Sequence, residues 1–446
     1  MIMSTKSHAS NSTQSLSDVP ARCQPALELL LAHRGNPSTE VDRVLADDPQ
    51  CLFGHCLRAA LIVLADDGAA RPSLAASLAV IEAASPHPDE PARRHATAAR
   101  AWLDGDPGLA AERYGAIVND RPTDILALVV AHALDFRLGQ RHMLRDRLAQ
   151  VLPAWDATMP GYASVLAMYA FGLEENGQYR LAERTARRAL ASDAGHPAAI
   201  HVIAHVLEMQ GRTREGLRFL AATQWAWSEG TGFSVHLAWH QALFHLDSGD
   251  PAAALAVYDQ QIARGRAADM NGLADGSALL WRLQLRNFDL GARWQLLADG
   301  WERQSLAGAR PFYVVHAMMA FAAAGRATAA ARLFAALPHA DPRAISQQPP
   351  EEAFAEPFCE GLLAFARADY AASVEWLTRV RHIADRCGGS LAQCDLIHLT
   401  FTEAALRARK SRLARALVAE RAEKKPASLL NRLLQRRWRM IVPAIA

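Results

Sequence analysis

Residues 173–190, LEENGQYRLAERTARRAL, contain the pattern that decides the fold. An apolar helix end leads into a turn at Gly177, a few polar residues follow, and Ala and Leu then recur three and four residues apart. The same order of features recurs in WLDGDPGLAAERY (102–114), LEMQGRTREGLRFL (207–220) and LDSGDPAAALAVYD (246–259). The chain is therefore predicted to repeat a pair of amphipathic helices joined by a tight turn.

The turn residue of each copy serves as a marker for the repeat. The markers are Gly105, Gly139, Gly177, Gly211, Gly249, Asn287, Gly325 and finally Ala368. Subtraction of their numbers gives steps of 34, 38, 34, 38, 38, 38 and 43 residues. The basic tetratricopeptide period is about 34 residues, and one added helical turn explains the longer steps. Glycine suits this turn because a residue with a Cβ adopts its backbone conformation only at a cost.

This period predicts an all-α fold, a tetratricopeptide-like α-solenoid of antiparallel helix pairs in a right-handed superhelix. Hydrophobic residues make up 51% of the 446 residues and aromatic residues only 7%, which suits closely packed helices. We expect a disordered N-terminal tail at 1–24, rich in Ser, Thr and Asn, followed by the helical repeat array at 25–425. Residues 426–446 are expected to form a basic capping helix and tail.

Charge, cysteine usage and missing motifs exclude several function classes. The formal net charge is only +2, so no strong field attracts nucleic acid or an anionic membrane. The six cysteines form no CxxC pair, which argues against a disulfide framework or a cysteine zinc site and favours reduced thiols in the cytoplasm. No apolar run is long enough to span a membrane. GxGxxG, GxxxxGK[ST] and GxSxG are missing, so nucleotide-binding and α/β-hydrolase functions have no support.

The period also predicts which polar residues face the concave side of the array. In tetratricopeptide arrays the first helix of each pair lines this side. His201, His205 and Glu208 occupy inward positions of one such helix, at i, i+4 and i+7. The other residues predicted to face inward are His95, Phe171, Glu174, Glu175, His236, Trp239, His240, Asp247, Ser277, Trp281 and His316.

Two HxxxH pairs, HVIAH (201–205) and HLAWH (236–240), are expected on neighbouring inward helices. Imidazoles four residues apart share one side of a helix, so the four histidines suggest a divalent metal ion as cofactor. A histidine beside Glu174 or Glu208 is equally suited to general acid–base catalysis. Neither pair has the intervening Glu of HExxH, so no zinc-protease mechanism follows. The alternative is structural: hydrogen-bonded histidines and packed tryptophans between helices.

Two functions remain open on the sequence alone. One is a binding protein that holds a small polar molecule or a peptide in a concave pocket lined by His, Trp and acidic residues. The other is an enzyme that uses the same pocket, with His201, His205, Glu208 and Glu174 as the catalytic candidates and either a metal ion or acid–base chemistry. The sequence names no substrate and no oligomeric state.

Several longer segments together resemble the tetratricopeptide repeat protein 38 family, over about residues 53 to 426. They include RPTDILAL (121–128), MYAFGLEENGQYRLAE (168–183), HVIAHVLEMQGRTREGLRFL (201–220), WHQALFHLDSGD (239–250) and GGSLAQCD (388–395). The resemblance implies a soluble repeat protein, adds His132 to the ligand-binding candidates and transfers no catalytic residue. Family members often carry Asn and Trp where this chain has Leu237 and Ala238, so the shape of the pocket is expected to differ.

Overall fold

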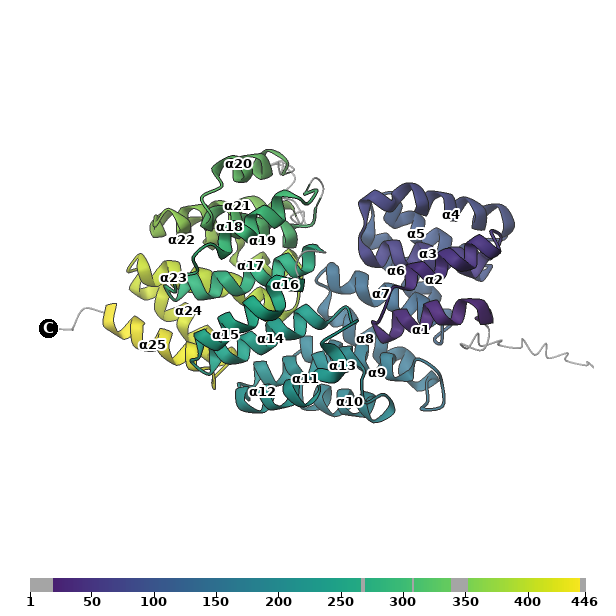
Figure 1. The fold of residues 1–446 in the computed structure, drawn as a ribbon, viewed down its shortest axis with the longest axis horizontal. Coiled ribbons are helices and arrows are strands. Elements are labelled where there is room, and N and C mark those ends of the chain that lie inside the picture. The colour runs from purple at the N-terminus through teal and green to yellow at the C-terminus, as the bar shows by residue number, and fades with distance from the viewer. Residues whose placement is uncertain (1–18, 266–268, 307–308, 338–351, 442–446) are drawn as a thin grey trace, which may run out of the picture. The chain divides into compact units, whose positions relative to one another are not determined.

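The structure is a computed structural model that describes residues 19–265, 269–306, 309–337 and 352–441 (Figure 1). Within these ranges the regular elements are helices, with no strand. Helices pair across short turns, and successive pairs pack on one another. The chain is therefore an all-α helical-repeat protein of the solenoid class, as the period of the turns predicts.

The helix pairs follow one another along the chain. In order they are α1 (Gln24–Ala32) with α2 (Pro37–Asp47), α3 (Leu52–Ala65) with α4 (Arg71–Ala84), α5 (Pro91–Leu103) with α6 (Pro107–Asp120), α7 (Ile125–Arg137) with α8 (Arg141–Val151), α9 (Tyr162–Glu175) with α10 (Tyr179–Ser192), α11 (Pro197–Met209) with α12 (Thr213–Ala222), α14 (Ser234–Asp247) with α15 (Pro251–Val257), α17 (Met270–Leu285) with α18 (Arg293–Glu302), α19 (Pro311–Ala323) with α20 (Ala327–Ala335), α21 (Glu352–Ala366) with α22 (Tyr370–Val380), and α23 (Leu391–Arg407) with α24 (Ser411–Lys424). The helices α13 (Gln224–Trp227), α16 (Ala263–Gly265) and α25 (Leu429–Ile441) are additional.

The left-handed turns fall where the sequence markers place them. Every marker residue lies between the two helices of one pair and has a positive φ, between 60° and 91°. Asn287 and Ala368 adopt this backbone, with φ of 62° and 60°, although both carry a Cβ. The same conformation recurs at His33, Asp66 and Arg409, with φ of 53°, 56° and 54°. These three residues mark further pair turns that the sequence pattern did not reveal.

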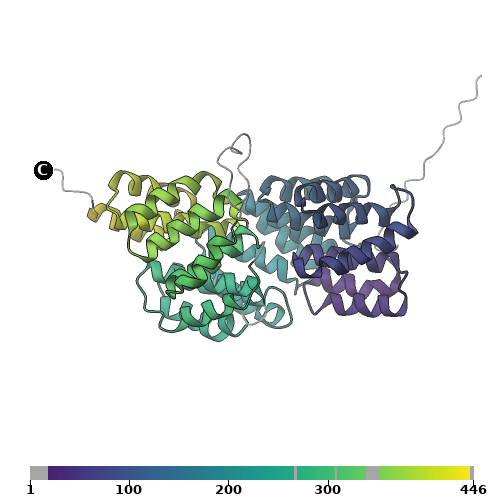
Figure 2. The same ribbon diagram turned by 90° about the horizontal axis from the view of Figure 1, so that it is seen from above.

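The chain divides into two compact units. Unit 1 comprises Met1–Asp135 and His142–Gly172, and unit 2 comprises Phe136–Arg141 and Leu173–Ala446. In both units the helices of successive pairs lie side by side (Figures 1 and 2). The division falls inside α7 and α9, so no linker separates the units along the chain. The expectation of one unbroken array at 25–425 did not include this division.

The two ends of the predicted array differ slightly from the observed helices. Most of the predicted tail, residues 1–18, lies outside the described residues. Helical structure begins at Ala21, before the predicted boundary at residue 25, because Cys23 is fully buried and the first α-helix already starts at Gln24. The predicted C-terminal helix is α25, which packs on α24 and α23, and residues 442–446 lie outside the described part.

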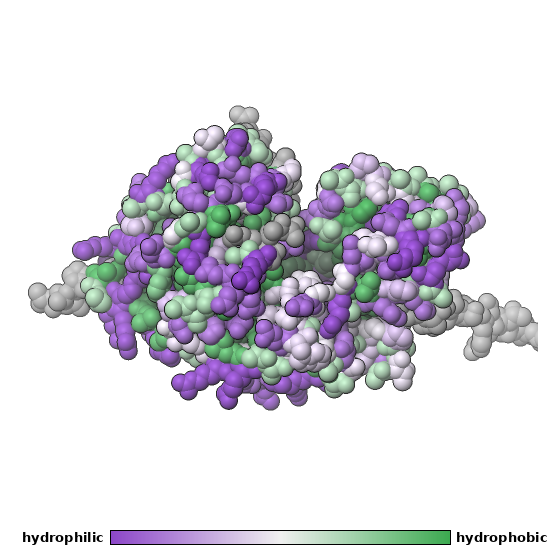
Figure 3. Space-filling model, viewed as in Figure 1, coloured by the Kyte–Doolittle hydropathy of each residue, from purple (hydrophilic) through white to green (hydrophobic). Residues whose placement is uncertain are grey.

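None of the described helices combines the length and the apolar character that crossing a membrane requires. On the face seen in Figure 3, hydrophilic residues predominate, and hydrophobic residues are scattered rather than gathered into one band.

Helix α11 lies in the interior of unit 2. All of its residues except Ala198 are buried, which follows from an almost uniformly apolar sequence around the helix. Buried polar side chains are costly unless they find partners. The histidines and the glutamate of α11 must therefore be matched by groups on the helices that pack against it.

Candidate metal centre

Four histidines on two neighbouring helices of unit 2 face one another. His201 and His205 lie on consecutive turns of α11, and His236 and His240 lie on consecutive turns of α14. One ring nitrogen from each lies within 4.8 Å of those from the others. The ring centroids are 4.3 Å apart for His201 and His205, and 4.5 Å apart for His205 and His240. The two HxxxH pairs thus form a single cluster.

Carboxylates from three different helices hold three of these imidazoles. Each carboxylate lies on the first helix of a pair, namely on α9, α11 or α17. Nδ1 of His240 donates to Glu208 Oε2 at 2.9 Å, and Nδ1 of His236 donates to Asp275 Oδ2 at 2.9 Å. Nδ1 of His205 shares a hydrogen bond of 3.2 Å with Glu174 Oε2.

For His236 and His240, whose partners Asp275 and Glu208 accept from Nδ1, this pattern selects one tautomer of the ring. A neutral imidazole that donates from Nδ1 carries its lone pair on Nε2. Nε2 of His240 is buried and has no hydrogen-bond partner within the part of the chain that the structure describes. Metal-bound histidines commonly show this arrangement, with the second ring nitrogen held by a carboxylate. The carboxylates therefore orient the rings as a second shell of a metal site does.

Burial keeps the central imidazoles neutral. The side chains of His205 and His240 are fully buried, whereas that of His236 is 18% exposed. Burial, the dominant cause, lowers the pKa of His205 to about 4 and that of His240 to about 3. Both rings are consequently unprotonated at neutral pH, which is the state that binds metal ions.

A buried ion pair fixes Glu208 beside the cluster. Lys425, which follows the last residue of α24, places its Nζ 2.8 Å from Glu208 Oε1. Burial by itself raises the pKa of Glu208, but Lys425 and His240 together hold it well below its usual value. Glu208 is therefore an anion that binds Lys425 with one oxygen and His240 with the other.

A pair of consecutive glutamates ends α9 next to His205. Burial raises the pKa of Glu174 and that of Glu175 to about 8. Glu175 binds Nε of Arg141 at 3.2 Å and accepts the backbone N–H of Leu391 at 3.0 Å. The two glutamates and His205 form a second group whose ligand atoms lie within 4.8 Å of one another. This group lies at the edge of the histidine cluster and shares His205 with it.

Several predicted inward residues pack as part of the protein interior. Trp239 stacks on His236 with ring centroids 5.2 Å apart, so it forms one wall of the cluster. Ser277 and Trp281 are fully buried; Trp301 donates to Ser277 Oγ, and Trp281 donates to Thr400 Oγ1. These two predicted ligand-binding residues thus have no access to solvent in this structure.

The remaining predicted residues are not among the four clustered histidines or the carboxylates that bind them. His95, His132 and Phe171 belong to unit 1, where His132 and Phe171 meet edge to face with centroids 6.1 Å apart. His316 donates from Nδ1 to the carbonyl of Phe312 at 2.6 Å. Asp247 accepts a hydrogen bond from Ser428 Oγ at 3.1 Å.

Sequence reasoning missed two residues that organise the cluster. Asp275 does not occupy a position of the repeat that was expected to point inward, although it follows His236 by one repeat length. Lys425 lies 217 residues after Glu208, and its neighbour Lys424 carries the same charge while remaining exposed. The order of residues alone gives no signal that distinguishes these two lysines.

No family model matches this sequence. The resemblance to the tetratricopeptide repeat protein 38 family stays a prediction drawn from the quoted segments. The cluster is accordingly characterised by its own geometry and chemistry.

The buried base His316 is expected to make the fold sensitive to acid. Burial, opposed by the hydrogen bond to Phe312, lowers its pKa to about 4, whereas an unfolded histidine titrates near pH ~6.5. As the pH falls from 6.5 to 4, the unfolded chain gains a proton that the folded chain does not bind, so stability decreases. The contribution of this group reaches about 3 kcal/mol at pH 4.

The variant His316→Leu lacks this contribution. Urea unfolding midpoints at pH 7 and pH 4.5 should therefore fall less on acidification in this variant than in the wild type. Replacement of the exposed His382 with leucine is the matched control and should leave the change of the urea midpoint with pH as it is in the wild type. Equal acid sensitivity of the wild type and His316→Leu would contradict the prediction.

Proposed function

We propose that the protein binds a divalent transition-metal ion between α11 and α14, with His201, His205, His236 and His240 as its ligands. The observation that carries the proposal is the orientation of three imidazoles by carboxylates on neighbouring helices. At His236 and His240, hydrogen bonds of this kind leave Nε2 as the ligand atom and raise its basicity. The four imidazoles each place one ring nitrogen within 4.8 Å of the others, which is close enough for one ion to draw them together.

The donor set favours zinc over magnesium or calcium. Imidazole nitrogen suits Zn²⁺, Ni²⁺, Cu²⁺ and Fe²⁺, whereas Mg²⁺ and Ca²⁺ prefer oxygen. Four nitrogen ligands match the tetrahedral preference of Zn²⁺, with bonds of about 2.0–2.1 Å. Bonds of this length would require the ligand atoms, which lie within 4.8 Å of one another, to stand close enough to share one ion.

One observation favours an enzyme rather than a purely structural metal site. The side chain of His236 is 18% exposed, while those of His205 and His240 are fully buried. A metal ion in the cluster would therefore have its accessible side at His236, and a catalytic role would require water to take a coordination position there beside the three other imidazoles. The hypothesis of a peptide in an open groove has less support, because Ser277 and Trp281 are fully buried.

Metal analysis of the full chain without a histidine tag tests this proposal. We expect about one Zn²⁺ or similar ion per chain after purification, and uptake of one Co²⁺ by chelator-treated protein. Co²⁺ bound by four nitrogens should show the intense visible absorption of a tetrahedral site. Protein that holds no metal, and that gives no tetrahedral Co²⁺ spectrum on titration, would refute the proposal.

A further inference from the structure

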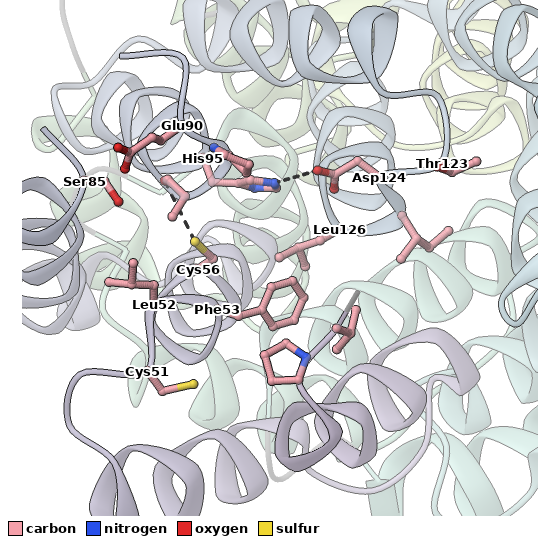
Figure 4. Close-up of a pocket in the computed structure, with 15 residues that line it drawn as sticks. Cys51, Leu52, Phe53, Cys56, Ser85, Glu90, His95, Thr123, Asp124 and Leu126 are labelled. Atoms are coloured by element: carbon pink, nitrogen blue, oxygen red, sulfur yellow. Dashed lines mark hydrogen bonds and ion pairs between the residues drawn. The ribbon is translucent and has the colours of Figure 1, made fainter. Parts of the chain in front are cut away.

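Unit 1 contains a cavity of about 400 Å³ beside the beginnings of α3, α5 and α7 (Figure 4). Most of its wall is apolar, and the main contributors are Leu52, Phe53, Pro91, Ile125 and Leu126. Small-molecule sites commonly measure about 300–1,000 Å³ and combine apolar walls with a few polar groups. The cavity therefore has the size and the lining of a binding site, and it is independent of the metal centre in unit 2.

A buried histidine and an aspartate form the polar part of this cavity. Nε2 of His95 donates to Asp124 Oδ2 at 3.0 Å, and Asp124 Oδ1 accepts the backbone N–H of Ala127 at 3.0 Å. Figure 4 shows this pair above Phe53 and Leu126 in the view chosen. Nδ1 of His95 is buried and has no hydrogen-bond partner among the described residues. The cavity thus offers a charged hydrogen-bonding group beside an apolar wall.

The lining of the cavity carries two acidic side chains. Glu90 and Asp124 line it, and none of the lining residues that the structure describes is Lys or Arg. Burial opposes ionisation of Asp124, but His95 and the N–H of Ala127 outweigh it and lower its pKa. Glu90 makes no ion pair within the described ranges. Asp124 accepts one hydrogen bond at each oxygen, and a carboxylate oxygen can accept a second, so both carboxylates can receive a hydrogen bond from a cation.

The N-termini of three helices lie beside the cavity, but they do not reverse its preference for a cation over an anion. Helix N-termini favour anions because their first N–H groups have no partners within the helix. At two of the three helices the chain supplies an acidic residue itself: Glu90 occupies the N-cap position of α5, and Asp124 caps the first turn of α7 with a hydrogen bond. An additional anion in the cavity would face two carboxylates. A carboxylate or phosphate ligand is therefore disfavoured.

We infer that this cavity binds an apolar molecule that carries an amine, with the ammonium group donating to Asp124 and the hydrocarbon part lying against Phe53 and Leu126. The ammonium supplies donors for the carboxylate, and a charge-assisted hydrogen bond of this type is stronger than one between neutral groups. The apolar part displaces water from the wall of the cavity.

Calorimetric titration of the full chain with octylamine, octanol and octanoate tests this inference. The three probes share one hydrocarbon chain and differ in the head group. Octylamine is expected to bind at least about tenfold more tightly than octanol, because only its ammonium forms a charge-assisted hydrogen bond, and octanoate is expected to bind most weakly. Equal or tighter binding of octanoate, or no binding of octylamine, would overturn the inference.

Three variants locate the binding. Asp124→Asn keeps a side-chain oxygen for the N–H of Ala127 but removes the charge, so octylamine should lose about tenfold in affinity while octanol is affected little. Glu112→Gln removes the same charge from an exposed position of α6 and should change nothing. Ala92→Phe fills the cavity and should abolish binding of all three probes. Unchanged octylamine binding in either Asp124→Asn or Ala92→Phe would place the ligand elsewhere and overturn the inference.

Discussion

Replacement of His240 with alanine is expected to lower the affinity of the protein for Zn²⁺ by at least about a hundredfold. His240 is fully buried in the cluster, and its Nε2 has no hydrogen-bond partner in the described part of the chain. Loss of a second-shell partner alone typically costs about 10–100-fold in metal affinity, so loss of a ligand should cost more. Competition with a chromophoric chelator measures the change directly.

The same helix provides the control for this variant. His245 lies on α14 outside the cluster and is partly buried, so His245→Ala should bind Zn²⁺ like the wild type. Glu208→Gln keeps the size of the side chain but cannot hold His240 in the same way, and we expect a smaller loss, about 10–100-fold. Zn²⁺ binding that is equally strong in His240→Ala and His245→Ala would show that the four imidazoles do not form the site.

Replacement of Lys425 with methionine is expected to destabilise unit 2 by about 3–5 kcal/mol, because it leaves the carboxylate of Glu208 buried without its cation. Burial disfavours the charged form of Lys425, but Glu208, Asp395 and Asp247 raise its pKa above the usual value, so the ammonium is charged in the fold. The midpoint of urea unfolding, followed by far-ultraviolet circular dichroism without added metal, reports the loss.

Two further variants separate the ion pair from other effects of the substitution. Lys424→Met changes the neighbouring exposed lysine and should shift the midpoint very little. Glu208→Gln combined with Lys425→Met removes both charges and should recover part of the stability lost in Lys425→Met. A double variant that is no more stable than Lys425→Met would show that the buried charge of Glu208 is not the cause.

The turns account for what the sequence predicted correctly about the fold. A left-handed residue ends the first helix of each pair, and glycine at most of these positions makes the period visible. His33, Asp66 and Arg409 adopt the same backbone at a steric cost. Because none of them is glycine, the sequence pattern does not mark the helix pairs that contain them. Aligning the repeats at their turn glycines is sufficient to predict that the two HxxxH pairs lie on neighbouring helices.

The partners of the histidines were less accessible to sequence reasoning. Glu174 and Glu208 precede their histidine partners by 31 and 32 residues, close to one repeat, so the period brings each pair together. Lys425 approaches Glu208 across 217 residues, which depends on how distant repeats of unit 2 pack. Ser277 and Trp281 were expected in a groove, yet tertiary packing buries both, because the period fixes a direction and not the exposure that results.

The position of the cluster near the middle of the chain has a consequence for cooperativity. In a linear array each repeat contacts mainly its neighbours, so segments open separately and hydrogen exchange is expected to vary along the chain. An ion shared by α11 and α14 has to leave before either helix opens, which adds about 2.7 kcal/mol to that opening when free metal is a hundred times its dissociation constant. Bound metal would thus make the two adjacent repeats open cooperatively, so that their amide hydrogens exchange at similar rates.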